Sequence, residues 1–313
     1  MSQTRMRMRM VPTVPARSSS ELFLELRRRL TDRDRQLLEL VWEHRVLTTH
    51  QVSVILFSTP GKGRHRLLEL FRMRAVERFQ PWVPVGAAPF HWVLGPLGAE
   101  VLAAERGITV NELGYRRAAT LAICHSQHLG HQVGVNEFFT RLHAHARHTP
   151  NANLAKWWSE RRCAQLWGDL ARPDAYGRWT ETEPHTGQPT KIDFFLEHDT
   201  GSTVLAKVAA KLGGYTALAE ATGITTPVLF WLPSVRREIN LRRQLGTPEI
   251  PVATAVQTAS SASPADSVWL PAGHTGPRRR LIELADTWPT PGEPTTTMPA
   301  SSGSDTGEDA SCR

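Results

Sequence analysis

Residues 30–76 read LTDRDRQLLELVWEHRVLTTHQVSVILFSTPGKGRHRLLELFRMRAV, and this stretch decides the fold of the N-terminal part. Thr31, followed closely by two aspartates, is a typical helix start, because its side chain caps free backbone N–H groups and acids favour the positive end of the helix dipole. Apolar residues then recur at helical spacing in three segments, which are separated by the threonines at 48–49 and the turn at 58–61. The stretch predicts three consecutive helices, the third from Lys62 to about Val76.

A β-hairpin is expected directly after the third helix. Two runs of β-forming residues, 78–85 and 90–94, are joined by the loop Gly86-Ala87-Ala88-Pro89. A further helix is then expected from about Gly95 to Ala104. Three helices, a hairpin and a closing helix are the order of a winged helix-turn-helix domain.

The third predicted helix carries positive charge outside its apolar face. Such a helix fits the major groove of DNA, where cationic side chains contact phosphates and guanine edges. The formal net charge of +7 also favours an anionic partner. The candidate DNA-binding residues are Lys62, Arg64, His65, Arg66, Arg72 and Arg74. The alternative is a solvated basic face on a domain that binds another protein.

The second half of the chain predicts a helix, three strands, a helix and a strand, in that order. The expected segments are a long helix over 116–147, strands over 154–161, from 172 and over 191–199, a helix carrying Lys207, Lys211 and Tyr215, a strand over 227–232 and a basic helix over 234–245. This is the order of the restriction-endonuclease-like PD-(D/E)XK core. The predicted fold class is therefore a two-domain α+β or α/β protein, with a winged helix followed by an αβββαβ nuclease-like domain.

Two acids lie where the nuclease motif has its metal ligands. Pro173-Asp174 leads the second strand and Glu197 lies on the third. Carboxylates on neighbouring strands hold Mg²⁺, which activates water and stabilises the phosphoryl transition state. Asp199 stands where the motif has lysine, so Lys211 on the following helix is our candidate for the water-orienting base. Asp199 and Glu160 are candidate auxiliary acids. The alternative, which we favour, is an inactive scaffold with these acids in salt bridges.

Other potential metal ligands in this half do not form a site in the sequence. Two histidine clusters, at 125–131 and 143–148, include no carboxylate or cysteine of their own that would complete a zinc site. The cysteines at 124, 163 and 312 show no metal-ligand spacing and are interpreted as reduced thiols of a cytoplasmic protein.

The chain divides into four parts. Residues 1–20 are expected to be a disordered basic arm, 21–112 the winged helix, 113–285 the nuclease-like domain and 286–313 a disordered tail. Within the third part, residues 253–265 are expected to form a loop before a last short strand at 268–270. No stretch approaches the roughly 18 to 20 apolar residues of a membrane span, so no membrane partner is expected.

Both halves together resemble the replication-relaxation family of bacterial plasmids and integrative conjugative elements. The motifs that carry the resemblance are Leu30-Thr31-Asp32-Arg33-Asp34, Leu129-Gly130-His131-Gln132-Val133-Gly134-Val135-Asn136, Arg172-Pro173-Asp174-Ala175-Tyr176, Phe195-Leu196-Glu197-His198-Asp199-Thr200-Gly201, and Lys211 with Tyr215. The resemblance implies a setting in plasmid replication or DNA relaxation.

Three functions are compatible with these features. The leading one is a DNA-binding accessory protein of a mobile element, with double-stranded DNA and a replication or conjugation protein as partners. The second is a Mg²⁺-dependent endonuclease that nicks origin DNA, with Asp174 and Glu197 as metal ligands. The third is a winged-helix transcriptional regulator. The sequence leaves the DNA site and the oligomeric state open.

Overall fold

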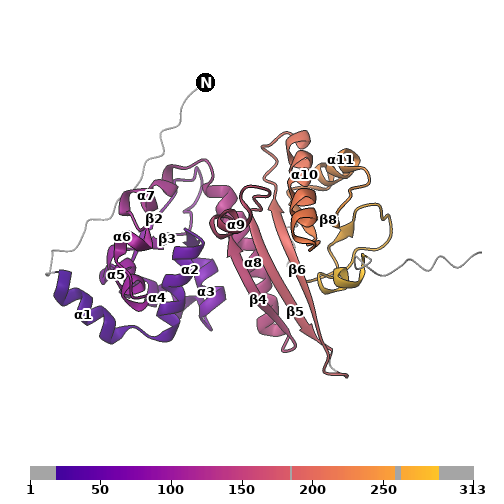
Figure 1. Ribbon diagram of the computed structural model, residues 1–313. Helices are drawn as coiled ribbons and strands as arrows, with labels where there is room; N and C mark the ends of the chain where they lie inside the picture. The colour runs from indigo at the N-terminus through magenta and orange to yellow at the C-terminus, as the bar shows by residue number, and fades with distance from the viewer. Residues whose placement is uncertain (1–18, 184, 258–261, 289–313) are drawn as a thin grey trace, which may run out of the picture.

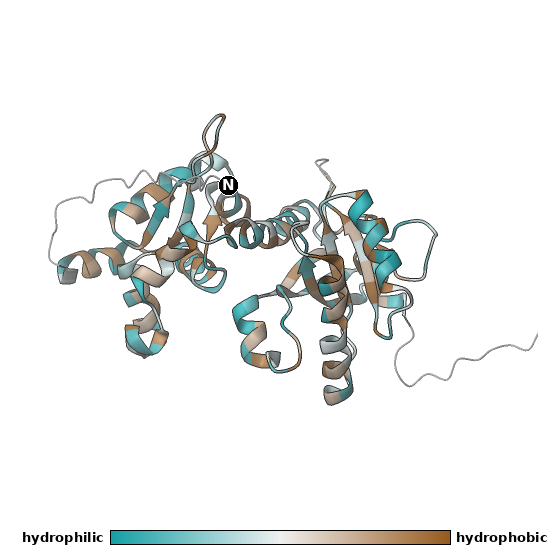
Figure 2. Cartoon of the chain, turned by 90° about the horizontal axis from the view of Figure 1, so that it is seen from above, coloured by the Kyte–Doolittle hydropathy of each residue, from teal (hydrophilic) through white to brown (hydrophobic). Residues whose placement is uncertain are grey.

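The computed structural model describes residues 19–183, 185–257 and 262–288 of the chain. The structure is mixed α+β and has two parts that lie side by side (Figures 1 and 2). The first part is mainly helical with a small sheet, and the second is built around a six-stranded sheet. The segments expected to be disordered lie largely outside the described residues, but Ser19 and Ser20 begin the first helix and Trp288 packs against the second core.

The first part begins with four helices, of which the second to fourth correspond to the three predicted ones. Its elements are α1 (Ser19–Arg29), α2 (Asp32–Glu43), β1 (Leu47–Thr48), α3 (Thr49–Leu56), α4 (Pro60–Arg72), β2 (Val76–Phe79), β3 (His91–Leu94), α5 (Pro96–Glu105) and α6 (Val110–Leu113). The three strands pair antiparallel in the order β1-β3-β2. Leucines from the helices and Trp92 of β3 form one buried core.

Side-chain caps fix where these helices begin. Thr31 accepts a hydrogen bond from the Asp34 amide, and Asp34 accepts one from the Thr31 amide in return. Thr48 and Gln51 form the same reciprocal box on α3, and Thr59 caps α4. The prediction that Thr31 starts a helix is thereby confirmed. Helix α4 ends at Arg72, four residues earlier than expected from the sequence.

The two strands after α4 are shorter than predicted, with eleven residues between Phe79 and His91. The guanidinium carbon of Arg78 lies 4.1 Å from the ring centroid of Phe90 and 4.8 Å from that of Phe71. These cation–π contacts hold the end of the loop against α4.

The long helix expected over 116–147 is broken into three. The pieces are α7 (Arg117–Ala122), the 3₁₀ turn η1 (Ile123–His125) and α8 (Leu129–His148). Ser126 has an extended backbone, and its hydroxyl accepts a hydrogen bond from the His128 amide. This local bond competes with helix continuation, as serine side chains commonly do.

Helix α8 joins the two parts. The Asn136 side chain donates to the Val46 carbonyl at 2.6 Å, and the Gln51 side chain donates to the Val133 carbonyl at 3.0 Å. Near its other end, the Arg147 guanidinium donates to the Phe57 carbonyl at 2.6 Å. Asn136 and Arg147 of α8 thus bond backbone carbonyls of the first part, and Gln51 of the first part bonds a carbonyl of α8, so the two parts share an ordered interface.

The second part is a mixed sheet covered by helices on both faces. Its elements are β4 (Ala152–Ser159), α9 (Glu160–Trp167), β5 (Ala175–Thr182), β6 (Pro189–His198), α10 (Leu205–Thr222), β7 (Val228–Leu232), α11 (Val235–Leu245), β8 (Val252–Val256), β9 (Leu270–Pro271) and the 3₁₀ turn η2 (Ile282–Asp286). The strand order is β4-β5-β6-β7-β8-β9, with β6-β7 and β7-β8 parallel and the other pairs antiparallel.

Alternation along β6 divides the core between the two faces. Phe194 and Leu196 pack with α8, whereas Phe195 packs with α9 and α10 on the opposite face. Glu197 shares the face of Phe195, which directs its carboxylate toward α10.

Two sequence predictions in this part were wrong. The strand expected to run to Arg161 ends at Ser159, whose hydroxyl caps α9, so Glu160 is the first residue of a helix. Residues 253–265 are not simply a loop, because Val252–Val256 forms β8 and pairs parallel with β7. Alanine and threonine give this strand low hydrophobicity, yet it is buried inside the sheet. No helix in the described part of the chain is long and apolar enough to cross a membrane.

Candidate carboxylate site and cationic helix

The strand register brings the predicted acids to one end of the sheet. Ser159 at the end of β4 lies opposite Ala175 at the start of β5, and Ala175 lies opposite Leu196 near the end of β6. Glu160, Asp174 and Glu197 are the immediate chain neighbours of these three residues. Their common end of the sheet is therefore a direct consequence of antiparallel pairing.

Asp174 and Glu197 converge on Lys211 of α10. The Lys211 Nζ lies 2.5 Å from Glu197 Oε2 and 3.6 Å from Asp174 Oδ1. Tyr215, one helical turn further along α10, donates from its hydroxyl to Glu197 Oε1. The spacing of four places Lys211 and Tyr215 on one helix face. The lysine thus supplies the positive charge between two carboxylates that are nearly inaccessible to solvent.

Burial and charge separate the ionisation of the two carboxyl groups. Burial, together with the negative charge of Asp174, raises the pKa of Glu197. Burial also disfavours ionisation of Asp174, but His131, Lys211 and the His198 amide outweigh it and lower the Asp174 pKa. Asp174 is therefore the ionised member, and Glu197 is the member that takes up a proton more readily.

Two histidines flank Asp174 and were not predicted as part of the site. His131 Nε2 of α8 lies 3.3 Å from Asp174 Oδ2, and the His198 amide donates to the same oxygen at 2.7 Å. Burial and the charge of His131 lower the pKa of His198 to about 4. The His198 ring lies so close to α8 that a Cβ at Gly134 would be 2.0 Å from its Nε2, so only glycine fits there. His131 and Gly134 both belong to the segment that carried the family resemblance.

The two auxiliary acids have other surroundings. Asp199 accepts two hydrogen bonds from the Arg237 guanidinium, at 2.7 and 3.2 Å, and one from the Gly201 amide. This bidentate pair fixes the start of the β6–α10 connection and occupies both Asp199 oxygens. Glu160 is exposed at the start of α9, where its charge helps to raise the pKa of His131.

The donor set has only part of what a magnesium site needs. Mg²⁺ is commonly held by one or two carboxylates together with waters and substrate phosphates, and Asp174 and Glu197 match that chemistry. Among the described residues, no three histidines, cysteines or acids form a metal-binding group. Both Glu197 oxygens already accept hydrogen bonds, and Lys211 lies between the two carboxylates. A metal ion there would have to displace the lysine.

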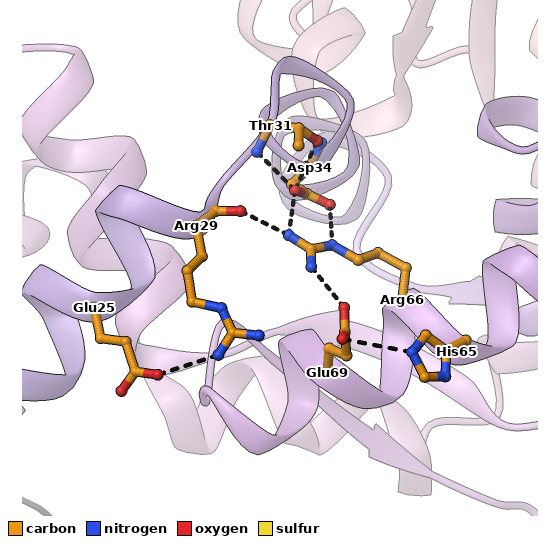
Figure 3. Close-up of polar contacts among 7 residues, drawn as sticks. All are labelled: Glu25, Arg29, Thr31, Asp34, His65, Arg66 and Glu69. Atoms are coloured by element: carbon orange, nitrogen blue, oxygen red, sulfur yellow. Dashed lines mark hydrogen bonds and ion pairs between the residues drawn. The ribbon is translucent and has the colours of Figure 1, made fainter.

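The candidate DNA-binding residues, five on α4 and Arg74 just beyond its end, fall into two groups. Lys62, Arg64, His65, Arg72 and Arg74 are exposed to solvent. Arg66 is not, because its guanidinium donates to both Asp34 oxygens at 2.9 and 2.7 Å, to the Arg29 carbonyl and to Glu69 (Figure 3). Its side chain is 20% exposed and that of Asp34 only 1%. Arg66 therefore joins α4 to the start of α2, whereas the other five are accessible from solvent, with His65 3.5 Å from Glu69 and Lys62 donating to the Ser58 hydroxyl at 3.3 Å.

These features define an α+β protein in which an exposed cationic helix is joined, through α8, to a sheet holding a lysine-bridged carboxylate pair. The replication-relaxation family model matches residues 38–230, which run from α2 to β7 and make up more than half of the chain. The chain belongs to the replication-relaxation family, and this membership suggests a role in plasmid replication or relaxation. No curated protein and no solved structure matches it.

Proposed function

We propose that the protein binds double-stranded DNA through residues 21–112 and acts as an accessory factor in the replication or relaxation of a mobile element. In this proposal the N-terminal part is a winged helix-turn-helix domain and α4 is its recognition helix. The observation that carries it is the exposure of Lys62, Arg64 and His65 along the first turns of α4. The charges of Lys62 and Arg64 are available to phosphates and base edges without breaking any buried ion pair.

The arrangement around α4 supports this assignment. Helices α2, α3 and α4 are followed by β2 and β3, and the loop between these strands would serve as the wing. Arg78 secures that loop beside α4 through its contacts with Phe71 and Phe90. A recognition helix must project from a rigid domain, and the caps on α3 and α4 together with the Arg66 network provide that rigidity.

We expect Lys62→Ala/Arg64→Ala to weaken binding to a duplex oligonucleotide and to make that binding less dependent on salt. If both side chains contact phosphates, the slope of log K against log salt should fall in magnitude by about 2, since each phosphate contact contributes about 0.9. Mobility shift across a salt series measures both quantities.

The matched control is Arg236→Ala/Arg243→Ala, which removes two exposed arginines from α11 in the second part. Equal loss of affinity in the control and the α4 variant would indicate a nonspecific effect of net charge. Unchanged affinity and slope in the α4 variant would contradict DNA binding by this helix.

For the second part we propose a nuclease-like scaffold in which Lys211 replaces the metal charge. The second candidate function, a Mg²⁺-dependent endonuclease, is favoured by the convergence of Asp174, Glu197 and Lys211 at one end of the sheet. If Mg²⁺ binds there, Asp174 and Glu197 would hold it, and the ion would supply Lewis-acid activation of water. Lys211 would then orient that water by donating a hydrogen bond to it.

Supercoiled plasmid incubated with the protein and Mg²⁺ or Mn²⁺ separates these two roles. We expect Asp174→Ala, Glu197→Ala and the wild type to bind the plasmid alike and to leave it supercoiled. Conversion to open circles by the wild type alone would overturn the scaffold proposal and make the protein a metal-dependent nickase.

A further inference from the structure

A cleft of about 370 Å³ lies where the first part meets the second. The cleft is lined by the end of α2 and Arg45 just beyond it, by the start of α9, and by residues of α7. Trp42 and Leu94 give the cleft an apolar floor, and Gln132 and Thr120 add polar groups. Its lining includes none of the residues proposed to contact DNA from α4.

Three arginines from three separate elements line this cleft. Arg45 follows α2, Arg116 precedes α7, and Arg161 lies in the first turn of α9. Arg161 is held in place, because its guanidinium lies 4.4 Å from the Trp42 ring centroid, donates to the Trp42 carbonyl and is 3.9 Å from a Glu43 oxygen. Arg45 and Arg116 are exposed, and within the described part of the chain their side chains make no hydrogen bond or ion pair.

The acids near the cleft leave much of this positive charge uncompensated. Glu160 is the acidic residue in its lining. Glu43 lies behind the wall, where one of its oxygens accepts hydrogen bonds from the Ser159 amide and hydroxyl and the other faces Arg161. The cleft therefore presents two unpaired guanidinium groups and a fixed third one to solvent, a combination suited to an anion with several oxygen acceptors.

Arg45 occupies a backbone conformation that a long side chain rarely adopts. Its φ is 66°, in the left-handed region, directly after the C-cap of α2. Glycine or asparagine is usual at such a position, because a Cβ there is strained. The chain nevertheless carries an exposed arginine with no protein partner at this point, and strain of this kind clusters at ligand sites.

We propose that this cleft binds a phosphate group. The exposed side chains of Arg45 and Arg116 would contact the phosphate oxygens, and Arg161, which is held by Trp42 and Glu43, would contribute a third positive charge. The cleft adjoins the carboxylate end of the sheet, since Gln132 in its lining follows His131, which contacts Asp174. Ser159 and Glu160, also in the lining, lie at the same sheet end. The phosphate comes either from the DNA backbone or from a small free phosphate compound, and both sources present the same oxygens to the arginines.

Calorimetric titration with inorganic pyrophosphate and with a duplex oligonucleotide tests the proposal and distinguishes the sources. The cleft variant is Arg45→Asn/Arg116→Ala, in which asparagine tolerates the left-handed backbone. The matched control is Arg236→Ala/Arg243→Ala, and Lys62→Ala/Arg64→Ala serves as the α4 variant. Circular dichroism melts verify that all four proteins are folded.

If the phosphate comes from a small free compound, we expect the cleft variant to bind pyrophosphate at least ten-fold more weakly than the wild type. The control and the α4 variant should then bind pyrophosphate as the wild type does. For a DNA backbone source, the cleft variant instead loses at least ten-fold in duplex affinity while the control retains it. The proposal is overturned if the cleft variant binds both ligands like the wild type, or if neither ligand binds the wild type. Loss of duplex binding in the α4 variant, with duplex binding retained in the cleft variant, would support DNA binding by α4 and would rule out the DNA backbone as the source of the phosphate in the cleft.

Discussion

Arg66→Ala is expected to lower the free energy of unfolding by about 2 to 3 kcal/mol, because removing one partner of a buried ion pair leaves the other charge uncompensated. This loss is smaller than the about 3 to 5 kcal/mol typical of a fully buried pair, because Asp34 would keep its hydrogen bonds to Thr31 and because Arg66 is partly exposed. Arg64→Ala, two residues away on the same helix, is the matched control and should change stability by less than about 0.5 kcal/mol. Urea denaturation of the three proteins measures the difference.

The effect of Arg66→Ala should depend on pH. Burial disfavours ionisation of Asp34, but hydrogen bonds from Arg66 and Thr31 outweigh it and lower the Asp34 pKa. A carboxyl group whose pKa is lowered by folding stabilises the protein above its ordinary pKa, and that contribution is lost as the pH falls through the folded pKa. The stability difference between wild type and Arg66→Ala should therefore shrink toward acid pH. A difference that stays constant with pH would mean that the ion pair with Asp34 is not its source.

The same pair of variants separates folding from DNA recognition. Below its melting temperature, Arg66→Ala should retain most of the duplex affinity, whereas Arg64→Ala should lose affinity while remaining as stable as wild type. The reverse pattern would assign DNA contact to Arg66 and contradict the geometry of Figure 3.

The contrast between Arg64 and Arg66 shows what the sequence of α4 could reveal. The apolar spacing predicts the helix and its buried side, but both arginines lie outside that side. The partner of Arg66 is Asp34, which is 32 residues earlier in the chain and already explained locally as a first-turn acid of α2 that bonds the Thr31 cap. A tertiary ion pair of this separation has no signal in helical periodicity, so the sequence could not distinguish a structural arginine from a free one.

The second part was predictable where strands are strongly apolar and less so elsewhere. Strands β6 and β7 were expected near their observed bounds, because both are rich in aromatic and β-branched residues. Strand β8 was missed because its buried residues are mostly small. Helix α9 was also missed, although Ser159 followed by Glu160 is a usable helix-start signal. The two tryptophans at 157–158 favour a strand, so the sequence predicted that the strand continues past Ser159.

Of the residues predicted to form the site, Asp174, Glu197 and Lys211 lie in direct contact in the structure. The sequence placed the two acids at the positions of the nuclease motif and the lysine on a helix face by four-residue spacing, but the contact among them depends on the strand pairing seen in the structure. His131 approaches Asp174 from α8 on the opposite face of the sheet, and only the packing of that helix decides the contact. The unpaired arginines of the cleft likewise come from three elements and share no sequence pattern.

Lys211→Met should destabilise the protein more at pH 8 than at pH 5. Without the lysine, Asp174 and Glu197 face each other without a shared cation, and the folded state then holds protons more tightly than the unfolded state. A carboxyl group whose pKa is raised by folding loses stability as the pH rises above its ordinary pKa. Since Lys211 is 43% exposed, water compensates part of the loss, and we expect about 1 to 3 kcal/mol at pH 8. Thermal melts across this pH range measure the effect, with Lys207→Met, an exposed lysine of the same helix, as the control.

Magnesium then distinguishes a scaffold from a metal site in a way that does not depend on activity. If Lys211 takes the place of the metal, Mg²⁺ should leave the melting temperature of the wild type unchanged and should raise that of Lys211→Met, because two carboxylates without a cation become available to the ion. A ligand at about 100 times its Kd stabilises the folded state by about 2.7 kcal/mol. Asp174→Asn/Lys211→Met should lose this response, since one of the two ligands is gone. Stabilisation of the wild type by Mg²⁺ that is lost in Asp174→Asn would show that the ion binds at this site in spite of Lys211. That result would contradict the scaffold proposal and leave the plasmid assay to test the endonuclease function.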